Sequence, residues 1–387
     1  MNIAILTSGR LPVPAVLGGA VENLTDYYLE YNNAHHLHHI TVYSIKSDKI
    51  VSPDTEYNHY YYVDVKSKIA KIRKGVYAKF NKEAYYDSEI EYFLHRSLQH
   101  MKKQNYDCVI LENRPGYAMA VRRVTKAKIV LHLHNDLLNK DTYKAKDMIT
   151  CLSKVITVSN FIKGRVETVG AGIPIKTVHN GIDLERFHSQ SPQTAITKKS
   201  LGFDDDDFVA VYSGRLTKEK GIKELLEAFL LLKDCPKLKL LIIGGSFYGN
   251  DTVSLSPFMT ELQQMAEQIQ GRVVFTGYIN YDNIPIYLRL ANVSIIPSIW
   301  DDPFPTTVLE AMAAGLPIIA TKSGGIIESG GDCALFVSKA NVVSELKDAL
   351  YTLYTDAVRC EAMAAQGLSI SKKYDKVRYA SEFYQQL

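Results

Sequence analysis

Short, continuously apolar runs alternate with helical patterns along most of this 387-residue chain. Parallel strands give such runs, because helices cover both faces of their sheet and few strand positions meet water. The alternation restarts after a turn-rich, polar stretch near residues 170–200. The sequence therefore predicts an α/β protein with two Rossmann-like parallel-sheet domains. The runs that we expect to be strands are Ile3–Thr7, Ile40–Ile45, Cys108–Glu112, Ile129–His132, Lys154–Val158, Phe208–Tyr212, Leu238–Ile243, Val273–Phe275, Val293–Pro297 and Ile318–Ala320.

The break in the pattern sets the expected domain boundaries. We expect an N-terminal domain over 1–185, which would bind an acceptor, and a C-terminal domain over 186–371, which would bind a nucleotide. A last helix over 372–387 is expected to cross back to the N-terminal domain. Ligands of parallel sheets bind beyond the carboxyl ends of the strands. Functional residues should therefore follow strands and face a central cleft between the two sheets.

Composition excludes several classes of protein. The chain is 46% hydrophobic and 22% charged, as ordinary globular proteins are, and its net charge of +3 does not favour nucleic acid as a partner. No apolar run approaches the ~18 residues that a membrane span needs. The five cysteines are widely spaced and show neither a metal pattern nor a disulfide framework, which predicts a cytoplasmic protein.

Two glycines, Gly18 and Gly19, lie between the first predicted strand and a helix expected from about Val21. Glycine lets the backbone approach a ligand closely, and the start of a helix offers free N–H groups to an anion. Paired glycines also make ordinary turns, so both interpretations remain open at this point.

Two groups of residues could be considered for a metal. His132 and His134 share one side of a strand, with His134 at its carboxyl end, where it could contact a ligand. A hydrogen-bonded core position is favoured for His132, and the sequence offers this pair no clear third ligand. The acidic run Asp204–Asp207 is interpreted as a solvated turn. We therefore predict no metal site.

A basic loop follows the predicted strand that ends near Tyr212. Arg215 can bind phosphate with its forked guanidinium, Lys220 adds a point charge, and a helix begins near Gly221. The glycine spacing and the Lys-Ser/Thr ending of a Walker loop are absent. The loop is thus a candidate pyrophosphate site, and a solvated charged loop is the alternative.

The most informative segment runs from Pro297 to Pro317. Thr306 is predicted to cap a helix that ends at Gly315, and the amides of its first turn would form an anion site. Glu310 lies one turn further on, where its carboxylate can accept two hydroxyls of a ribose. Asp302 precedes the helix, in a loop that can meet a polar ligand.

Taken together, these motifs resemble the group 1, or family 4, glycosyltransferases of the GT-B fold, and the resemblance covers nearly the whole chain. It implies retaining transfer of a sugar from a nucleotide diphosphate to a hydroxyl, with the nucleotide sugar as a substrate and no cofactor or metal. The residues that carry it are Gly18-Gly19, His134, Val158–Phe161, His179–Phe187, Ser213-Gly-Arg215 with Lys220-Gly221, Phe275–Tyr278, the block 297–321 and Gly324-Gly325.

The resemblance also implies roles for individual residues. Arg215 and Lys220 would hold the diphosphate, Glu310 the ribose and the backbone near Tyr278 the base. His134 would contact the donor sugar near the reacting carbon, so that His134, Asp302, Arg215 and Lys220 form the expected catalytic set. The amides of the first helical turn would add to the phosphate site; they belong to Thr306, Thr307 and Val308.

The chain departs from the family pattern at two positions. The family's acidic pair, two glutamates eight positions apart, maps onto Asp302 and Glu310, so the first carboxylate is one methylene shorter here. Pro305 replaces the glycine that usually follows the phenylalanine. The choice of donor therefore does not follow from the family pattern alone.

Related bacterial enzymes build lipopolysaccharide and capsule. We accordingly expect a UDP-hexose or UDP-N-acetylhexosamine as donor and a glycan or lipid-linked saccharide as acceptor. Two alternatives share the fold: a sugar-nucleotide epimerase, and a nucleotide-sugar-binding protein with an inactive site. The presence of Arg215, Lys220 and Glu310 favours the transferase.

A basic stretch, Lys66–Lys82, holds seven lysine and arginine residues and no acidic one. Within it Ile69, Ile72, Val76 and Phe80 recur at helical spacing. Such a helix can either lie on an anionic membrane surface or pack on its own domain with a solvated basic face. We predict a weak, salt-sensitive contact with the inner face of the membrane, without a span.

Overall fold

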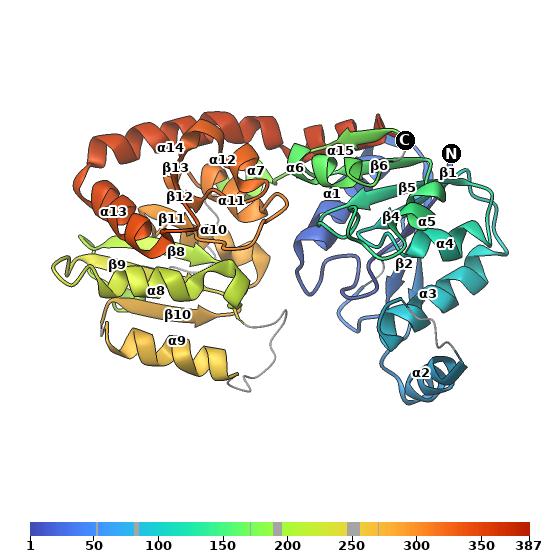
Figure 1. Cartoon of the computed structure of the whole chain (residues 1–387), viewed down its shortest axis with the longest axis horizontal. Coiled ribbons are helices and arrows are strands. Elements are labelled where there is room, and N and C mark those ends of the chain that lie inside the picture. The colour runs from blue at the N-terminus through green and yellow to red at the C-terminus, as the bar shows by residue number, and fades with distance from the viewer. Residues whose placement is uncertain (52, 81–84, 171, 189–195, 246–255, 270) are drawn as a thin grey trace. The chain divides into compact units, whose positions relative to one another are not determined.

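The computed structural model describes the chain except for residues 52, 81–84, 171, 189–195, 246–255 and 270 (Figure 1). The chain forms two compact units of similar size. Unit 1 comprises Met1–Asn180 together with Lys376–Leu387, and unit 2 comprises Gly181–Asp375. Each unit contains one parallel sheet covered by helices, as the continuous apolar runs predict.

Unit 1 contains a seven-stranded parallel sheet in the order β3-β2-β1-β4-β5-β6-β7. Apart from Asn2, the residues of β1 and β4 are buried, because each strand has a neighbour on both sides and helices on both faces. The strands are β1 (Asn2–Leu6), β2 (His39–Ile45), β3 (Asn58–Val63), β4 (Cys108–Glu112), β5 (Lys128–Leu133), β6 (Lys154–Thr157) and β7 (Ile175–Thr177). The helices are α1 (Ala20–His35), α2 (Lys68–Phe80), α3 (Ser88–Met101), α4 (Tyr117–Arg122), α5 (Ala145–Thr150), α6 (Asn160–Glu167) and α15 (Lys376–Tyr384).

Unit 2 contains a six-stranded parallel sheet in the order β10-β9-β8-β11-β12-β13. The strands are β8 (Phe208–Ser213), β9 (Leu238–Ile243), β10 (Val273–Gly277), β11 (Val293–Ile296), β12 (Ile318–Thr321) and β13 (Ala334–Val337). The helices are α7 (Leu184–His188), α8 (Ile222–Leu230), α9 (Pro257–Glu267), α10 (Ile284–Leu288), α11 (Thr306–Ala313), α12 (Ile326–Gly330), α13 (Val342–Thr355) and α14 (Ala357–Ser371).

Every run that the sequence predicts as a strand lies on a strand, with ends that differ by at most two residues. Three strands were not predicted: β3, β7 and β13. All three lie at the edge of a sheet. An edge strand has a neighbour on one side only, so its sequence does not need the continuous apolar run on which the prediction rests.

The last helix, α15, packs on α1 of unit 1, although it follows unit 2 in the sequence. The rings of Phe383 and Tyr28 stack with centroids 4.4 Å apart, and the Tyr384 hydroxyl donates to the Tyr28 carbonyl oxygen at 2.8 Å. Lys376 lies 3.5 Å from Glu30. The chain therefore returns to unit 1 to complete that unit's core.

One side of helix α2 contacts α3. Ala70 is buried, and Lys74 forms an ion pair of 2.5 Å with Glu89 on α3. On the other side Ile69, Ile72 and Val76 are 63%, 70% and 54% exposed. These three apolar side chains thus face outward. Across the described part of the chain, no helix combines the length and the apolar character that a membrane span needs.

Candidate active site

The loop after β8 in unit 2 carries the predicted phosphate-binding cations. Arg215 is partly exposed, and its Nη2 lies 3.6 Å from Glu219 Oε1. A single turn of helix, Lys218–Lys220, leads to Gly221, whose φ is 72°. A Cβ atom at Gly221 would lie 1.9 Å from the Pro297 carbonyl oxygen. Glycine is therefore required there, because the β8 loop is pressed against the end of β11.

Lys220 and Asp302, which are far apart in sequence, form an ion pair in unit 2. Lys220 Nζ lies 2.5 Å from Asp302 Oδ2 and 5.3 Å from the centroid of the Trp300 ring. Asp302 is 4% exposed. A buried carboxylate is costly unless it is paired, so Lys220 stabilises Asp302 in this position. The structure thus brings together two members of the expected catalytic set.

Two glycines fix the loop that carries Asp302. Gly324 has φ of 49°, and a Cβ atom there would lie 2.5 Å from the Asp302 carbonyl oxygen. The amide of Gly325 donates to the same oxygen at 2.7 Å. This close approach explains why the glycine pair after β12 belongs with the Pro297–Pro317 segment.

Helix α11 follows this loop and corrects one prediction. Thr306 does not cap the helix: it is the first helical residue, and Pro305, in an extended conformation, precedes it. The helix ends as expected at Gly315, with φ of 68°, where the Leu316 amide donates to Ala311 O at 2.9 Å. The amides of Thr306 and Thr307 belong to the first turn, where helix geometry supplies no acceptor. That of Val308 donates to Pro305 O at 3.2 Å.

Glu310 lies on α11 and is 5% exposed. Burial raises its pKa to about 7, against hydrogen bonds from Thr306 one turn earlier and from Tyr281. Tyr281 lies in the loop beyond β10, and Tyr278 directly follows that strand. The hydrogen bonds from Thr306 and Tyr281 do not offset the effect of burial on the pKa of Glu310. Hydrogen bonds from a ligand would stabilise its ionised form further.

The glycine pair of unit 1 lies beside a buried glutamate, Glu22, which the sequence analysis did not identify. Gly18 and Gly19 have φ of 76° and 111° and lead into α1. A Cβ atom at Gly19 would lie 2.2 Å from Glu22 Oε2. Burial raises the pKa of Glu22 to about 7, and the Ser8 hydroxyl donates to its Oε1 at 3.4 Å. The available signal was a single acidic residue in the first turn after two glycines.

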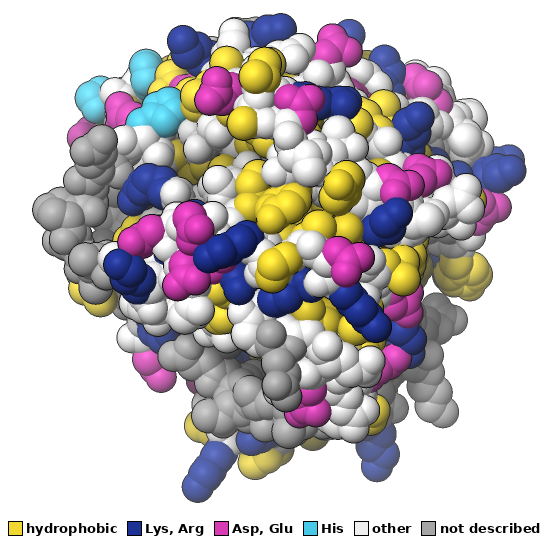
Figure 2. Space-filling view, turned by 90° about the vertical axis from the view of Figure 1, so that its left-hand side faces the viewer, with side chains coloured by type: hydrophobic (Ala, Val, Ile, Leu, Met, Phe, Trp, Pro, Cys, Tyr) yellow, Lys and Arg dark blue, Asp and Glu magenta, His cyan; other side chains and the backbone are white. Residues whose placement is uncertain are grey.

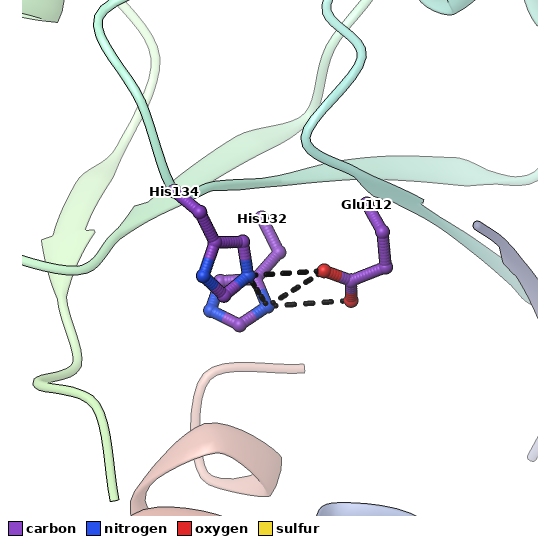
Figure 3. Close-up of side chains that lie close together, drawn as sticks. All are labelled: Glu112, His132 and His134. Atoms are coloured by element: carbon purple, nitrogen blue, oxygen red, sulfur yellow. Dashed lines mark hydrogen bonds and ion pairs between the residues drawn. The ribbon is translucent and has the colours of Figure 1, made fainter. Parts of the chain in front are cut away.

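Figure 3 shows the second group in unit 1, which consists of Glu112, His132 and His134. Glu112 ends β4, His132 lies opposite it on β5, and His134 follows the end of β5. Glu112 Oε2 lies 3.1 Å from His132 Nδ1 and 3.2 Å from His134 Nε2. His132 is fully buried and hydrogen-bonded, as expected. The sequence offered no third group beside the two histidines, and the structure supplies Glu112.

Burial opposes ionisation of Glu112, but His132 and His134 outweigh it and hold its pKa well below the usual range. Burial, assisted by the charge of His132, lowers the pKa of His134 to about 4 despite the opposing contact with Glu112. At neutral pH Glu112 is therefore ionised and His134 is neutral. His134 can act there as a hydrogen-bonding group but not as a cation.

The acidic run Asp204–Asp207 lies in the turn before β8. Lys237 Nζ lies 3.2 Å from Asp204 and 2.9 Å from Asp206, and Lys239 Nζ lies 3.7 Å from Asp207. Asp204 and Asp206 are largely exposed. Lysine amines therefore neutralise these carboxylates. The interpretation as a solvated turn is confirmed for Asp204 and Asp206 but is wrong for Asp207, which is 2% exposed.

Comparison with protein families gives two matches that together span most of the chain. The model described as glycosyl transferases group 1 matches residues 193–369, and the model described as glycosyltransferase family 4 matches residues 38–186.

Comparison with individual proteins gives matches over similar lengths. The putative glycosyltransferase YtcC of Bacillus subtilis is 28% identical over 84% of this chain and 76% of its own length. The lipopolysaccharide 1,2-N-acetylglucosaminetransferase of Salmonella typhimurium is 26% identical over 72% of this chain and 71% of its own length. The structure of Alr3699/HepE from Anabaena in complex with UDP is similar over 100% of this chain and 99% of that one, with a TM-score of 0.75 and 17% identity. The two proteins therefore have the same fold.

Proposed function

Since the chain belongs to the group 1 (family 4) glycosyltransferases and has their GT-B fold, we propose that its donor is a UDP-hexose or a UDP-N-acetylhexosamine. Membership of this family makes the protein a retaining transferase of the EC 2.4 class that uses nucleotide sugars. We further propose that the acceptor is a hydroxyl of a glycan or lipid-linked saccharide in cell-surface polysaccharide synthesis.

The observation that carries the proposed site of sugar transfer is the ion pair between Lys220 and Asp302. As the donor bond breaks, negative charge grows on the leaving diphosphate and positive charge on the sugar. Lys220 and Asp302 lie 2.5 Å apart, so a cation for the diphosphate and a carboxylate for the sugar are available side by side. In the proposed complex the diphosphate takes hydrogen bonds from Lys220 and Arg215, and the Asp302 carboxylate accepts hydroxyls of the sugar.

The remaining roles follow the same division. The carboxylate of Glu310 accepts hydrogen bonds from hydroxyls of the ribose, and the backbone near Tyr278 contacts the base. The first-turn amides of α11 add donors to the diphosphate, which suits the attraction of a helix start for anions. From unit 1, His134 contributes a hydrogen bond to the donor sugar, and the Gly18-Gly19 turn admits the substrate close to the backbone.

Support for UDP comes from the relatives. The Anabaena structure was determined with UDP, and one relative is described as a UDP-Gal-dependent galactosyltransferase of Escherichia coli. The Salmonella relative transfers N-acetylglucosamine in lipopolysaccharide. These descriptions favour a UDP-sugar donor and a surface-glycan acceptor for the present chain.

We also propose that α2 makes a weak contact with an anionic lipid surface. The sequence left open whether the apolar stripe of this helix packs inward, and in the structure Ile69, Ile72 and Val76 face outward. Exposed basic residues flank the stripe: Lys68, Lys71, Arg73 and Lys79. An outward apolar stripe among basic side chains is the arrangement with which helices bind membrane surfaces.

The basic stretch that contains α2 differs in charge from the face of the molecule drawn in Figure 2, which is the left-hand side of Figure 1. On the face drawn in Figure 2, Lys and Arg side chains alternate with Asp and Glu side chains around a central group of hydrophobic ones. By contrast, the stretch 65–82 contains no acidic residue. Charge complementarity therefore selects an anionic partner for α2.

A donor screen tests the proposed function. The full chain is incubated with UDP-, GDP- and dTDP-sugars, with free oligosaccharides or lipid-linked saccharides as acceptors. Nucleotide release and the anomeric configuration of the product are then measured, with Arg215→Ala as the inactive control. Acceptor-dependent UDP release with retained configuration is the expected result. A preference for GDP- or dTDP-sugars would overturn the proposed donor, and sugar-nucleotide conversion without any acceptor would indicate an epimerase.

A further inference from the structure

The cluster of Glu112, His132 and His134 in unit 1 contains one residue, Glu112, to which the proposed function assigns no role. Glu112 is 1% exposed and comes from β4, the strand beside the one that carries the histidines. It accepts a hydrogen bond from the Tyr28 hydroxyl at 2.8 Å through Oε1 and faces both histidine rings through Oε2. A buried carboxylate with this many partners is held in one orientation.

The position of His134 is fixed on two sides. Its backbone amide donates to Asn113 Oδ1 at 3.0 Å, and its ring Nε2 lies 3.2 Å from Glu112 Oε2. Asn113 directly follows Glu112, so one strand end holds both the backbone and the ring of His134. The side chain is 5% exposed, which leaves the ring little freedom to turn.

Hydrogen-bond accounting then assigns the protons. A carboxylate can only accept, so a ring nitrogen that hydrogen-bonds to Glu112 does so through its own hydrogen. His132 Nδ1 and His134 Nε2 both face it, and they lie only 3.2 Å from each other. Two arrangements satisfy these contacts: both nitrogens donate to Glu112, or His132 Nδ1–H is shared between Glu112 and His134 Nε2. The first gives the ionised carboxylate two donors and puts the proton of a neutral His134 on Nε2, with the Nδ1 lone pair on the opposite side of the ring (Figure 3).

We propose that Glu112 is a positioning residue: it keeps the His134 proton on Nε2, so that Nδ1 meets a sugar hydroxyl as a hydrogen-bond acceptor. The inference rests on the proposed contact between His134 and the substrate. His132 is a second donor to the same carboxylate and thereby helps to hold it. Its ring lies beside Phe383 of α15, with centroids 4.9 Å apart.

Glu112 Oε2, His132 Nδ1 and His134 Nε2 could instead surround a metal ion, since mutual separations of 3.1–3.2 Å also suit ligands about 2.0–2.1 Å from zinc. A metal would reverse the tautomer. It would bind the lone pair of His134 Nε2 and leave the proton on Nδ1, so the ring would present a donor rather than an acceptor. The two arrangements are thus distinguished by the position of one proton.

Nuclear magnetic resonance decides between them. In the full chain labelled with ¹⁵N-histidine, the two-bond ¹H–¹⁵N pattern reports each tautomer, and His134→Gln identifies the signal of His134. We expect the Nε2–H pattern in the wild type. Glu112→Gln should shift it toward the Nδ1–H form, because the Gln amide can donate to Nε2. An Nδ1–H pattern in the wild type, or stoichiometric zinc in the purified protein, would overturn the inference.

Kinetics test the positioning role. Glu112→Gln should lower kcat on the order of 10- to 100-fold, the usual cost of removing a group that orients a histidine. UDP affinity should stay unchanged, because the proposed nucleotide contacts belong to unit 2. Tyr28→Phe, which removes one hydrogen bond from Glu112 and keeps the ring, should shift kcat in the same direction by less. A fall in UDP affinity that matches the fall in kcat would contradict a positioning role.

The matched control is Glu91→Gln. Glu91 is also a buried glutamate of unit 1, where it accepts the amides of Tyr85 and Tyr86. Its variant should leave kcat and the His134 signal unchanged. Full turnover by His134→Gln would overturn the proposed substrate contact of His134 and the catalytic part of this inference. The tautomer measurement does not depend on activity and separates the two failures.

Discussion

Lys220 Nζ and Asp302 Oδ2 lie 2.5 Å apart, although 82 residues separate them in the sequence. The lysine side chain is 21% exposed and the aspartate side chain 6%. The pair links the end of β8 to the loop before α11. In the absence of substrate each residue is therefore the other's partner, and their variants should not behave independently.

Lys220→Ala should lower both activity and stability. Loss of a cationic donor to the leaving group costs about 2.7–4 kcal/mol, or about 10²- to 10³-fold in kcat/KM. It also leaves a buried carboxylate without its partner, at about 1–3 kcal/mol of unfolding free energy. The double variant Lys220→Ala/Asp302→Asn should regain stability but not activity. Urea unfolding of all four proteins measures the coupling, and strictly additive losses would show that the pair does not interact.

Arg215→Ala should separate activity from stability. Arg215 is partly exposed and its contact with Glu219 spans 3.6 Å, so little stability depends on it. We expect kcat/KM to fall about 10²- to 10³-fold, because the guanidinium is a proposed ligand of the diphosphate. The melting temperature should not change. Arg359→Ala on the exposed surface of α14 is the control, and turnover as high as that of this control would remove Arg215 from the site.

Glu310 should make nucleotide binding depend on pH. Its pKa of about 7 belongs to the unliganded protein, and the ionised carboxylate accepts from two ribose hydroxyls more strongly than a protonated carboxyl does, since the latter has lost its charge and one acceptor oxygen. Below pH 7 binding must displace a proton, so UDP affinity should decrease as pH falls from 8 to 6. Calorimetric titration of wild type and Glu310→Gln separates this effect from the titration of UDP itself. A wild-type profile parallel to that of the variant would exclude Glu310 from the ribose site.

The same titration distinguishes Asp302 from Glu310. Asp302→Asn should reduce turnover and leave UDP affinity close to that of the wild type, because its proposed ligand is the sugar. Glu310→Gln should weaken UDP binding directly. Equal losses of UDP affinity in the two variants would contradict this division of roles.

Activity should persist in EDTA. The cationic groups Arg215 and Lys220 are proposed to meet the charge of the diphosphate, and lysines neutralise the acidic turn before β8. Asp206→Asn should therefore be as active as the wild type. Loss of activity in EDTA that Mn²⁺ or Mg²⁺ restores would return the 204–207 run to consideration as a metal site.

Helix α2 should bind anionic liposomes at low salt and release them at high salt. Each basic residue near such a surface adds on the order of 1 kcal/mol, and salt screens that attraction. Ile69→Ser/Ile72→Ser should weaken co-sedimentation, whereas Val358→Ser, a change at an exposed aliphatic residue of α14, should not. Equal retention on neutral and anionic liposomes would exclude an electrostatic contact.

The sequence was most informative where burial is complete. Strands such as β4 and β9 have neighbours on both sides, so their apolar runs are uninterrupted and their bounds, Cys108–Glu112 and Leu238–Ile243, were predicted to the residue. The edge strands β3, β7 and β13 lack such runs. The restart of the strand pattern in mid-chain sufficed for two sheets, because each sheet is built from strands of one half of the chain.

The site was predictable in part, for a different reason. Arg215 and Asp302 follow strands, so a linear pattern locates them, but their partners depend on sheet order. In the sequence, Glu112 looks like an ordinary polar residue at the end of a strand. Only the pairing of β4 with β5 places it beside His132. The cap assigned to Thr306 failed because Pro305 already occupies that position, which frees the Thr306 side chain for Glu310.

The return of α15 to unit 1 bears on the order in which the protein is made. Residues 376–387 leave the ribosome only after all of unit 2, yet Phe383 and Tyr379 are fully or almost fully buried in the core of unit 1. The first 180 residues must therefore wait, with that part of their core open, while the next 195 are synthesised. During translation unit 2 has every residue that it needs before unit 1 does.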